Sequence, residues 1–352
     1  MGCCDQPFTF EPEQGGGDPP KLSRRGLLKG AGAAAGALAT LGGRAAAQAK
    51  PIKLAFCSQL LCVVPYEVAR AGGHFANEGL DVELVYTRGG NAAMQSLVGS
   101  AVDYAATSLD VALQAYVRGA DIRRFATTGR LPLFAIATAP RRADEIQRIE
   151  DLAGRTVGVS ALGNADHALM LYLLRRANVD PTKVQFATLG PNLLEALRQG
   201  QVDAGLVQEP ALTLVQKAGG RVLMNAMDSK DAERFLGGSY EFMGVAVRTP
   251  EIPARREEME KLARALRNGL QALQAMSPED LVKALPRELT TGADVSELRE
   301  VIARYRGSLY PTSVAIDLEA SNRVAESLKV AGLIPQGANT TGLYDTSIVG
   351  AG

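Results

Sequence analysis

Small polar residues stand at six places in the sequence where a predicted β-strand ends. They are glycines or carry hydroxyl, amide or carboxyl groups, with one leucine among them: Ser58, Gln59, Leu60, Gly89, Gly90, Asn91, Thr107, Ser108, Ser160, Gly163, Asn164, Asn192 and Glu209. Such groups can hold a small molecule through hydrogen bonds. Because ligands of parallel α/β sheets bind outside the carboxyl ends of the strands, we predict that these residues line a ligand site.

The glycine pair Gly89-Gly90 is the most informative of these places. Glycines let the backbone approach a ligand closely, and a helix predicted to begin near Asn91 would direct its free N–H groups at that ligand. A helix N-terminus favours anionic groups such as carboxylate, sulfonate or nitrate. The stretch lacks the G-x-G-x-x-G and P-loop patterns of nucleotide sites. A tight turn is the alternative for the glycines alone, but the repetition of small polar groups at several strand ends favours a ligand site.

Four larger side chains are further candidates with two interpretations each. Arg88 could form a bidentate, charge-assisted hydrogen bond with an anionic ligand, or simply be solvated. Glu209 precedes a predicted helix, so it could accept a hydrogen bond from a ligand amine or cap that helix. Tyr66 and Tyr240 could contact the ligand through an aromatic face or a hydroxyl group. Alternatively, they could only pack against other residues of the protein. We include all four among the candidate ligand-binding residues.

Cysteine and histidine chemistry is sparse. Cys57 and Cys62 flank the first candidate loop, and an oxidising compartment would permit a disulfide between them. A soft-metal role has no supporting cluster of methionines or histidines. His74 and His167 are the only histidines in the chain, and no Ser–His–Asp, Cys–His or paired-carboxylate pattern is evident. We predict a candidate disulfide, no metal site, no cofactor and no catalytic residue.

The first 49 residues have the pattern of an export signal. Arg24 and Arg25 precede a run of small apolar residues, and Ala47-Gln48-Ala49 fits a small-residue cleavage site. The arginine pair resembles a twin-arginine signal. The apolar run is too short and too rich in glycine and alanine to span a bilayer. We therefore predict a periplasmic protein that is exported by the twin-arginine route and cleaved near Ala49.

The composition and the order of elements predict an α/β protein with two lobes. Of the 352 residues, 46% are hydrophobic and 22% are charged, and the net charge is zero, which gives no indication of a nucleic-acid partner. Strands alternate with helices from residue 51 onward, and the pattern restarts at residue 155. Such alternation is typical of mainly parallel sheets flanked by helices.

Two apolar segments are predicted to cross between the lobes, at residues 131–140 and 238–249. The predicted division is therefore a signal peptide at 1–49, the first part of lobe 1 at 50–135, lobe 2 at 136–240, and the return to lobe 1 with the C-terminal helices at 241–352. Because the chain has returned to lobe 1, we expect the C-terminal helices to pack against it.

Several motifs follow one another in a recognisable order: "GGHFANEGLDVELV", "SLVGSAVDYA", "IEDLAGRTVGVS" and "ALRQGQVDAGLVQEP". Over nearly all of residues 51–330 the chain resembles the periplasmic substrate-binding proteins of ABC importers for nitrate, sulfonate, taurine and pyrimidine thiamine precursors. This resemblance implies the two-lobed periplasmic binding protein fold, which shuts on a ligand in the interlobe cleft. It also implies a monomer that delivers the ligand to an ABC permease and ATPase at the membrane.

Two alternatives to an importer subunit stay open. A cytosolic pyrimidine-precursor synthase of the same family suggests an enzyme, although the export signal and the missing catalytic pattern argue against one. A periplasmic sensor that reports a ligand to a membrane receptor has no distinguishing feature in the sequence. The ligand itself is predicted to be small and either anionic or aromatic and heterocyclic, so sulfonates, aromatic carboxylates and pyrimidines all remain.

Overall fold

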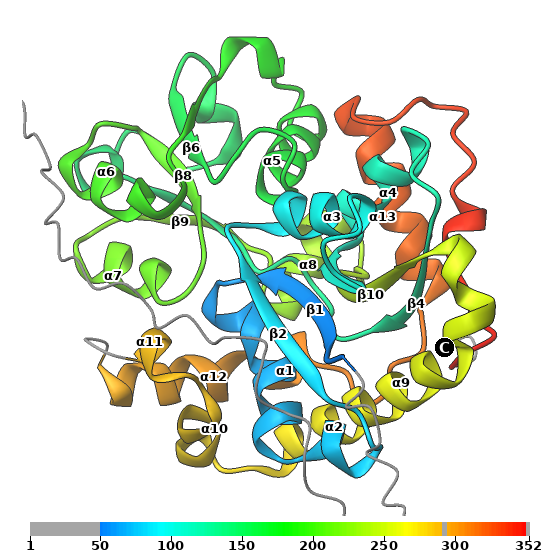
Figure 1. Ribbon diagram of the computed structural model, residues 1–352. Coiled ribbons are helices and arrows are strands. Elements are labelled where there is room, and N and C mark those ends of the chain that lie inside the picture. The colour runs from blue at the N-terminus through cyan, green and yellow to red at the C-terminus, as the bar shows by residue number, and fades with distance from the viewer. Residues whose placement is uncertain (1–49, 291–293, 350–352) are drawn as a thin grey trace, which may run out of the picture. The chain divides into compact units, whose positions relative to one another are not determined.

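The computed structural model describes residues 50–290 and 294–349, so the predicted export signal lies outside the described residues. Its first sheet has the strand order β2-β1-β3-β10-β4 (Figure 1). The strands are β1 (Ile52–Cys57), β2 (Val82–Thr87), β3 (Tyr104–Ser108), β4 (Ile122–Thr127) and β10 (Met243–Arg248). β1 pairs in parallel with β2 and β3, whereas β10 is antiparallel to both β3 and β4. All strands except β10 therefore run in one direction.

The second sheet repeats this plan with the order β7-β6-β8-β5-β9. Its strands are β5 (Ala135–Thr138), β6 (Thr156–Val159), β7 (Gln185–Thr188), β8 (Ala204–Val207) and β9 (Val222–Asn225). β6 is parallel to β7 and β8, and β5 is antiparallel to β8 and β9. In each sheet the single reversed strand comes from a segment that the sequence predicts to cross between the lobes. The predicted class, two mainly parallel sheets flanked by helices, is confirmed.

Helices alternate with the strands and then dominate after β10 (Figure 1). Those of the alternating region are α1 (Leu60–Ala71), α2 (His74–Asn77), α3 (Gly90–Val98), α4 (Leu109–Val117), α5 (Ala165–Arg176), α6 (Leu193–Gln199), α7 (Ala211–Lys217) and α8 (Ser229–Leu236). The later ones are α9 (Ile252–Ala275), α10 (Pro278–Ala284), α11 (Arg287–Thr290), α12 (Val295–Leu309) and α13 (Leu318–Ala331). Short 3-10 helices occupy Pro140–Arg142, Ile149–Leu152, Pro181–Lys183, Gly190–Asn192, Thr249–Glu251 and Thr341–Leu343.

Helix α1 begins earlier than the sequence suggests. The sequence predicts a loop at residues 57–65 and a helix from Tyr66, yet the structure begins α1 at Leu60 and places Pro65 inside it. Pro65 lacks a backbone N–H. The missing donor would leave the buried carbonyl of Leu61, four residues earlier, without a partner. The Tyr310 hydroxyl donates to that carbonyl at 2.7 Å. A residue at the end of α12 thus supplies the hydrogen bond that the helix itself cannot make. The sequence predicts a single helix over residues 66–79 with His74 near its end, but the structure has two helices here, because α1 ends at Ala71 and α2 begins at His74.

The C-terminal helices pack against helices that flank the first sheet, as the sequence predicts, and they also contact elements that flank or belong to the second sheet. α9 packs against α1 and α2, and α10 packs against α1 and α12. α13 contacts both α4 and α5. α12 reaches the second sheet through Tyr305, whose hydroxyl accepts a hydrogen bond from Asn225 at 2.9 Å. The predicted lobe boundaries at 135/136 and 240/241 stay a prediction.

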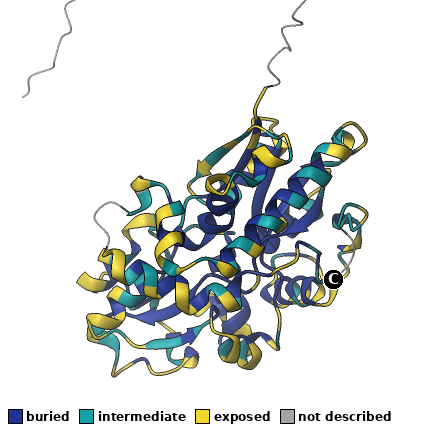
Figure 2. Ribbon diagram, turned by 90° about the horizontal axis from the view of Figure 1, so that it is seen from below, coloured by how far each residue is buried: buried dark blue, intermediate teal, exposed yellow. Residues whose placement is uncertain are grey.

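Burial is concentrated in the strands and in the inner faces of the helices (Figure 2). Strands β3, β5 and β8 are buried along their whole length, as expected for strands covered on both faces. Their apolar runs therefore do not alternate with polar residues. The exposed positions lie mainly on the outer faces of the helices, so the hydrophobic core surrounds both sheets.

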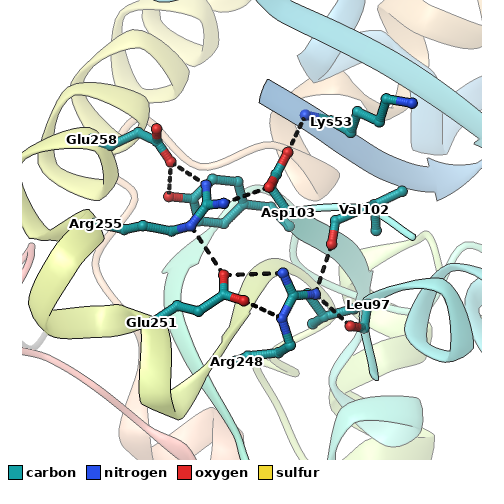
Figure 3. A network of polar contacts seen from close by, with 9 residues as sticks. Lys53, Leu97, Val102, Asp103, Arg248, Glu251, Arg255 and Glu258 are labelled. Carbon is teal, nitrogen blue, oxygen red and sulfur yellow. Dashed lines mark hydrogen bonds and ion pairs between the residues drawn. The ribbon is translucent and has the colours of Figure 1, made fainter. Parts of the chain in front are cut away.

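A polar network fixes the start of α9 to the amino end of β3 (Figure 3). Arg255 forms ion pairs with Asp103, Glu251 and Glu258, and the Tyr104 hydroxyl donates to Glu258 at 2.6 Å. Asp103 also accepts a hydrogen bond from the backbone N–H of Lys53 at 2.8 Å. The network lies at the end of β3 opposite to Ser108, so it serves the packing of α9 and not the ligand site.

Candidate functional site

A cavity lies where the carboxyl ends of β1 and β3 face the start of α5 and the end of β8. Its volume is about 40 Å³, and it adjoins a larger hollow of about 280 Å³. The two share Gln59, Phe134, Ser160, Asp166 and Gln208 in their walls. We call the cavity and the hollow together the cleft. Both sheets therefore contribute to one continuous site.

Ten of the residues that the sequence predicts lie along the cleft. Gln59, Arg88, Gly89, Gly90, Thr107, Ser108, Ser160 and Asn164 line the cavity. Leu60 and Glu209 line the adjoining hollow, together with Gln59 and Ser160. These residues come together because the strands that precede them end at the same edge of each sheet. The topological rule that guides the prediction is thus the reason for their convergence.

Six predicted residues do not line the cleft. Tyr66 is fully buried, and its hydroxyl lies 2.6 Å from the hydroxyl of Thr128. Tyr240 is also buried and donates to Asp110 at 3.0 Å. For both tyrosines the geometry corresponds to the packing interpretation. Ser58, Asn91, Gly163 and Asn192 are the other four, and Asn192 is an exposed residue at the end of a 3-10 helix.

Two of these residues hold the sides of the cleft together. The backbone N–H of Asn91, in α3, donates to the side-chain oxygen of Asn164 at 3.3 Å. The Gln114 amide, in α4, donates to the carbonyl of Gly163 at 3.1 Å. A Cβ atom at Gly89 would lie 3.1 Å from the Asn164 amide nitrogen, so glycine permits this close approach. The structure is therefore closed at this part of the rim.

Positive potential comes from the first-sheet side of the cleft. Helix α3 begins at Gly90, has no side-chain cap at Gly89 and has no acidic residue in its first turn. The N–H of Asn91 already donates to Asn164, so only the other N–H groups of the first turn are available to an acceptor. Arg88 is exposed beside them, and it forms no ion pair with any acidic side chain of the described residues. Together these groups can attract the anionic part of a ligand.

Negative charge lies on the second-sheet side, and the sequence analysis missed part of it. Asp166 in the first turn of α5 is 1% exposed and lines both parts of the cleft. Ser160 donates to its carboxylate through both the backbone N–H and the hydroxyl. Burial raises the pKa of Asp166, and the two hydrogen bonds from Ser160 partly offset that effect. Asp166 directly follows the loop at the end of a predicted strand, and this position could have indicated a site residue. An acidic residue there also resembles an ordinary helix cap, so the sequence does not single it out.

Glu209 caps the start of α7 with one carboxylate oxygen, which is one of the two interpretations that the sequence leaves open. Its Oε2 accepts hydrogen bonds from the backbone N–H of Thr213 at 3.1 Å and from the Thr213 hydroxyl at 2.9 Å. Its Oε1 is buried and has no hydrogen-bond partner. The neighbouring Gln208 also has a buried side-chain oxygen without a partner. Both residues line the hollow.

An apolar wall completes the cleft. Phe134 lies in the first crossing just before β5, and Phe242 lies in the second just before β10. Their rings meet edge to face with centroids 6.0 Å apart. Met243 and Val111 lie beside them. The sequence analysis assigns these aromatic residues to crossing strands and does not connect them with the ligand. The wall can bury the apolar part of a small molecule.

Cys57 and Cys62 form a disulfide, and both residues lie in the cavity wall. The bond links the end of β1 to the first turn of α1 across a Cα–Cα distance of 6.2 Å. It encloses the loop that carries Gln59, whose side chain makes no hydrogen bond within the described part of the chain. The bond thus restrains a residue that faces the cleft. Within the described ranges, no group of three or more His, Cys, Asp or Glu residues could hold a metal ion.

His167 lies close to the cleft but does not line it. Its Nδ1 accepts a hydrogen bond from the backbone N–H of Gly163 at 3.1 Å, and its ring packs edge to face on Phe186. Burial lowers the pKa of His167, which favours the neutral ring that this hydrogen bond requires. His167 therefore supports the loop that carries Gly163.

A family model described as NMT1/THI5 like matches residues 63–280, which is more than half of the chain. The chain belongs to the NMT1/THI5-like family. The family resemblance carried by the sequence is confirmed. Within the described residues, no helix has the length and apolar character that crossing a membrane requires.

Relatives of this NMT1/THI5-like chain include binding proteins. A putative binding protein of Bacillus subtilis (strain 168), YtlA, is 24% identical over 267 residues, covering 72% of this chain and 75% of that protein. A protein of Bordetella bronchiseptica RB50 superposes with a TM-score of 0.74 at 21% identity, covering 86% and 94% of the two chains. The alkanesulfonate-binding protein SsuA of Xanthomonas axonopodis pv. citri, bound to MOPS, gives 0.67 at 17% identity, covering 84% and 98%. These structures share the fold.

Proposed function

We propose that this protein is the extracytoplasmic solute-binding subunit of an ABC importer, and that it captures a small anionic or aromatic and heterocyclic ligand by hinge closure. The observation that carries the proposal is the convergence of polar groups from both sheets on one cleft, with contacts across its rim. Family membership and the binding proteins among the relatives support it. The N-terminal pattern of an export signal supports a periplasmic location reached by the twin-arginine route.

The residues of the cleft can form the interactions that ligand binding requires. Arg88 and the start of α3 can hold an anionic group, Gln59, Ser160 and Asn164 can form hydrogen bonds, and the Phe134–Phe242 wall can bury an apolar part. A micromolar dissociation constant corresponds to about −8 kcal/mol, which a few such contacts can provide. Ligand binding to both sides would favour the closed state.

The hinge of this motion would lie at the two crossings. Arg130, directly before the first crossing, and Glu241, on the second crossing, form an isolated antiparallel bridge. Opening about this pair would separate Asn91 from Asn164 and Gln114 from Gly163. Closure of this kind is a common response of two-lobed binding proteins to their ligands. We propose that the protein acts as a monomer that delivers its ligand to an ABC permease and ATPase.

The test is a ligand screen on the protein produced without residues 1–49. Thermal-shift measurements against alkanesulfonates, nitrate, aromatic carboxylates and pyrimidines should identify one class that raises the melting temperature. Native mass spectrometry would show any ligand that co-purifies, and small-angle scattering should show a smaller radius of gyration after ligand addition. Conversion of the ligand into a product by the protein alone would contradict the proposal in favour of an enzyme.

A further inference from the structure

The wall of the cleft contains a covalent cross-link, the Cys57–Cys62 disulfide. Cys57 is 8% exposed and Cys62 is 2% exposed. Because Cys57 keeps accessible surface and lies in the cavity wall, a small reductant can approach its sulfur from the cleft. The other two cysteines of the chain, Cys3 and Cys4, lie within the predicted export signal. Within the described residues the disulfide therefore has no further cysteine with which to exchange.

The fold as a whole depends little on this bond. The bond joins residues only five apart in the sequence, and a short closed loop restrains the unfolded chain less than a long one. Both segments that it joins have other support, since β1 pairs with β2 on one side and β3 on the other, and α1 packs against α2, α9 and α10. We therefore expect the sheets and helices to persist when the bond is reduced.

The position of Gln59, by contrast, depends on the bond. Gln59 lies inside the closed loop and lines both the cavity and the hollow. Its carbonyl accepts hydrogen bonds from the N–H groups of Cys62 at 2.9 Å and Val63 at 3.2 Å, and the N–H of the preceding Ser58 donates to the carbonyl of Thr87 at 2.9 Å. Neither the N–H nor the side chain of Gln59 forms a hydrogen bond with a described residue. Without the disulfide, the Gln59 side chain thus has more conformations to lose when a ligand binds.

We propose that the disulfide is a redox-controlled positioning element of the cleft. The oxidised form holds Gln59 where its amide can bond to the ligand, and reduction by a dithiol weakens ligand binding while the fold persists. The inference rests on the proposed function, because it concerns ligand affinity at the same cleft. Gln59 is the residue that contacts the ligand, and Cys57 and Cys62 act through it.

Reduction proceeds by thiol–disulfide exchange with the dithiol. A thiolate of the reductant forms a bond to Sγ of Cys57, the more exposed sulfur, and the disulfide breaks as Sγ of Cys62 leaves and takes up a proton. The second thiol of the reductant then attacks its own sulfur in this mixed disulfide, so that Cys57 leaves as a thiol and the reductant closes its own disulfide. Two electrons and two protons thereby pass from the reductant to the protein.

The passage between compartments gives such a device a use. Under the proposed function the twin-arginine route carries the folded protein from a reducing compartment into an oxidising one. The reduced cleft would bind its ligand weakly before export, and the oxidised cleft would bind it more tightly afterwards. The protein would thus acquire its full affinity only where it takes up the ligand.

The test compares the oxidised and the reduced protein, both produced without residues 1–49. Dithiothreitol gives the reduced form, and alkylation with mass spectrometry counts its two thiols. Isothermal titration calorimetry uses ethanesulfonate, nitrate, benzoate and uracil, one probe for each class of the ligand screen. The reduced protein should bind the tightest of these probes roughly three- to tenfold more weakly, which corresponds to about one hydrogen bond. Reoxidation should restore the affinity, and the double variant Cys57→Ser with Cys62→Ser should keep the lower one.

The variant Gln59→Ala separates positioning from a purely structural role of the bond. In the oxidised protein it should weaken the same probe to a similar extent, and reduction should then have little further effect, because the positioned side chain is gone. Gln199→Ala removes an exposed amide of α6 and is the control, which should keep the full redox dependence. Hydrogen exchange of the reduced protein should rise at the amides of Cys62 and Val63, while denaturant unfolding stays cooperative.

Four results would overturn the inference and leave the binding function standing: equal affinity of the oxidised and reduced forms, a bond that dithiothreitol reduces only in denaturant, loss of cooperative unfolding on reduction, and an undiminished effect of reduction in Gln59→Ala. The last would mean that the bond does not act through Gln59. If no probe binds either form, and the wider ligand screen also finds nothing, the proposed function fails together with the inference.

Discussion

Arg88 and Asp110 are charged residues of the first-sheet side with opposite environments. Arg88 is exposed at the cleft, and no described acidic side chain neutralises it. Asp110 in α4 is 2% exposed; its Oδ1 accepts a hydrogen bond from Tyr240, while its Oδ2 is buried without a partner. Arg88 can therefore be removed at little cost to the fold, whereas Asp110 couples the fold to pH.

Replacing Arg88 tests its role in binding an anionic ligand directly. Arg88→Ala should weaken an anionic ligand about tenfold or more, because a charge-assisted hydrogen bond is lost. The free energy of unfolding of the ligand-free protein should change by less than about 0.5 kcal/mol, as is usual for exposed side chains. Calorimetry and denaturant titration measure the two quantities. Arg175→Ala, at an exposed position of α5, is the control that should alter neither; unchanged affinity in Arg88→Ala would refute the role of Arg88.

Asp110 gives a prediction about pH. Burial raises its pKa to about 6, and the hydrogen bond from Tyr240 only partly offsets this. Because the folded state binds this proton more tightly than the unfolded state, the contribution of Asp110 to stability is complete at low pH and is lost as pH rises through 6. The loss amounts to about 3 kcal/mol at most, from roughly two pKa units.

The variant Asp110→Asn should remove this pH-dependent part. Its Oδ1 can still accept from Tyr240, so the difference in unfolding free energy between variant and parent should shift in favour of the variant between pH 4 and pH 7. Denaturant titrations across that range measure the difference. A control at the exposed Asp144, as Asp144→Asn, should show no comparable trend. A difference that stays constant with pH would contradict the assignment.

At the scale of single elements, α1 is a helix that continues through a proline. Proline normally interrupts a helix because it removes one backbone hydrogen bond. Here the lost bond is replaced by the Tyr310 hydroxyl, which comes from 249 residues away in the sequence. No local pattern around Pro65 could reveal that partner. One hydrogen bond of the helix therefore depends on the packed C-terminal region.

A double-mutant cycle tests this dependence. Tyr310→Phe should lower the free energy of unfolding by about 1–3 kcal/mol, since it leaves the Leu61 carbonyl buried without a donor. In the background of Pro65→Ala, whose new N–H can donate to the same carbonyl, Tyr310→Phe should cost markedly less. Denaturant unfolding of the four proteins gives the coupling free energy. A coupling near zero would mean that Tyr310 acts only through packing.

The elements of the fold could be predicted to a greater extent than the details of the cleft. Strand ends such as Thr107-Ser108 and Ser160 follow from alternation and from the rule that parallel strands end at one edge. Phe134 and Phe242 resemble ordinary strand residues, so their aromatic contact is invisible in the sequence. Tyr66 and Tyr240 find hydroxyl and carboxyl partners 62 and 130 residues away. Such pairings depend on the completed tertiary structure and not on local pattern.

At the scale of the whole described region, contacts across the cleft rim stabilise the closed arrangement. Gln114 donates to Gly163 from the other side of the cleft, yet Gln114 does not line the cleft. It can therefore affect ligand affinity only through closure. The affinity of a ligand that binds only the closed state increases with every contact that makes this state more populated.

Removing Gln114 should weaken ligand binding without touching the ligand. Gln114→Ala should reduce affinity roughly three- to tenfold, which corresponds to the net value of about one hydrogen bond. Small-angle scattering without ligand should show a more open average form. Gln199→Ala, which removes an exposed amide bonded within α6, is the control and should change neither measurement. Equal affinity of Gln114→Ala and the parent would show that this contact plays no part in closure.

The strand order of the two sheets also has a consequence for synthesis on the ribosome. The second sheet is encoded by one uninterrupted stretch, from β5 at residue 135 to β9 at residue 225. The first sheet needs β10, which lies between β3 and β4 and is translated only after all strands of the second. A nascent chain that ends before residue 243 contains every strand of the second sheet. It still lacks β10, the strand with which β4 pairs. The first sheet, although it begins nearer the N-terminus, thus cannot be complete before the whole second sheet has been translated.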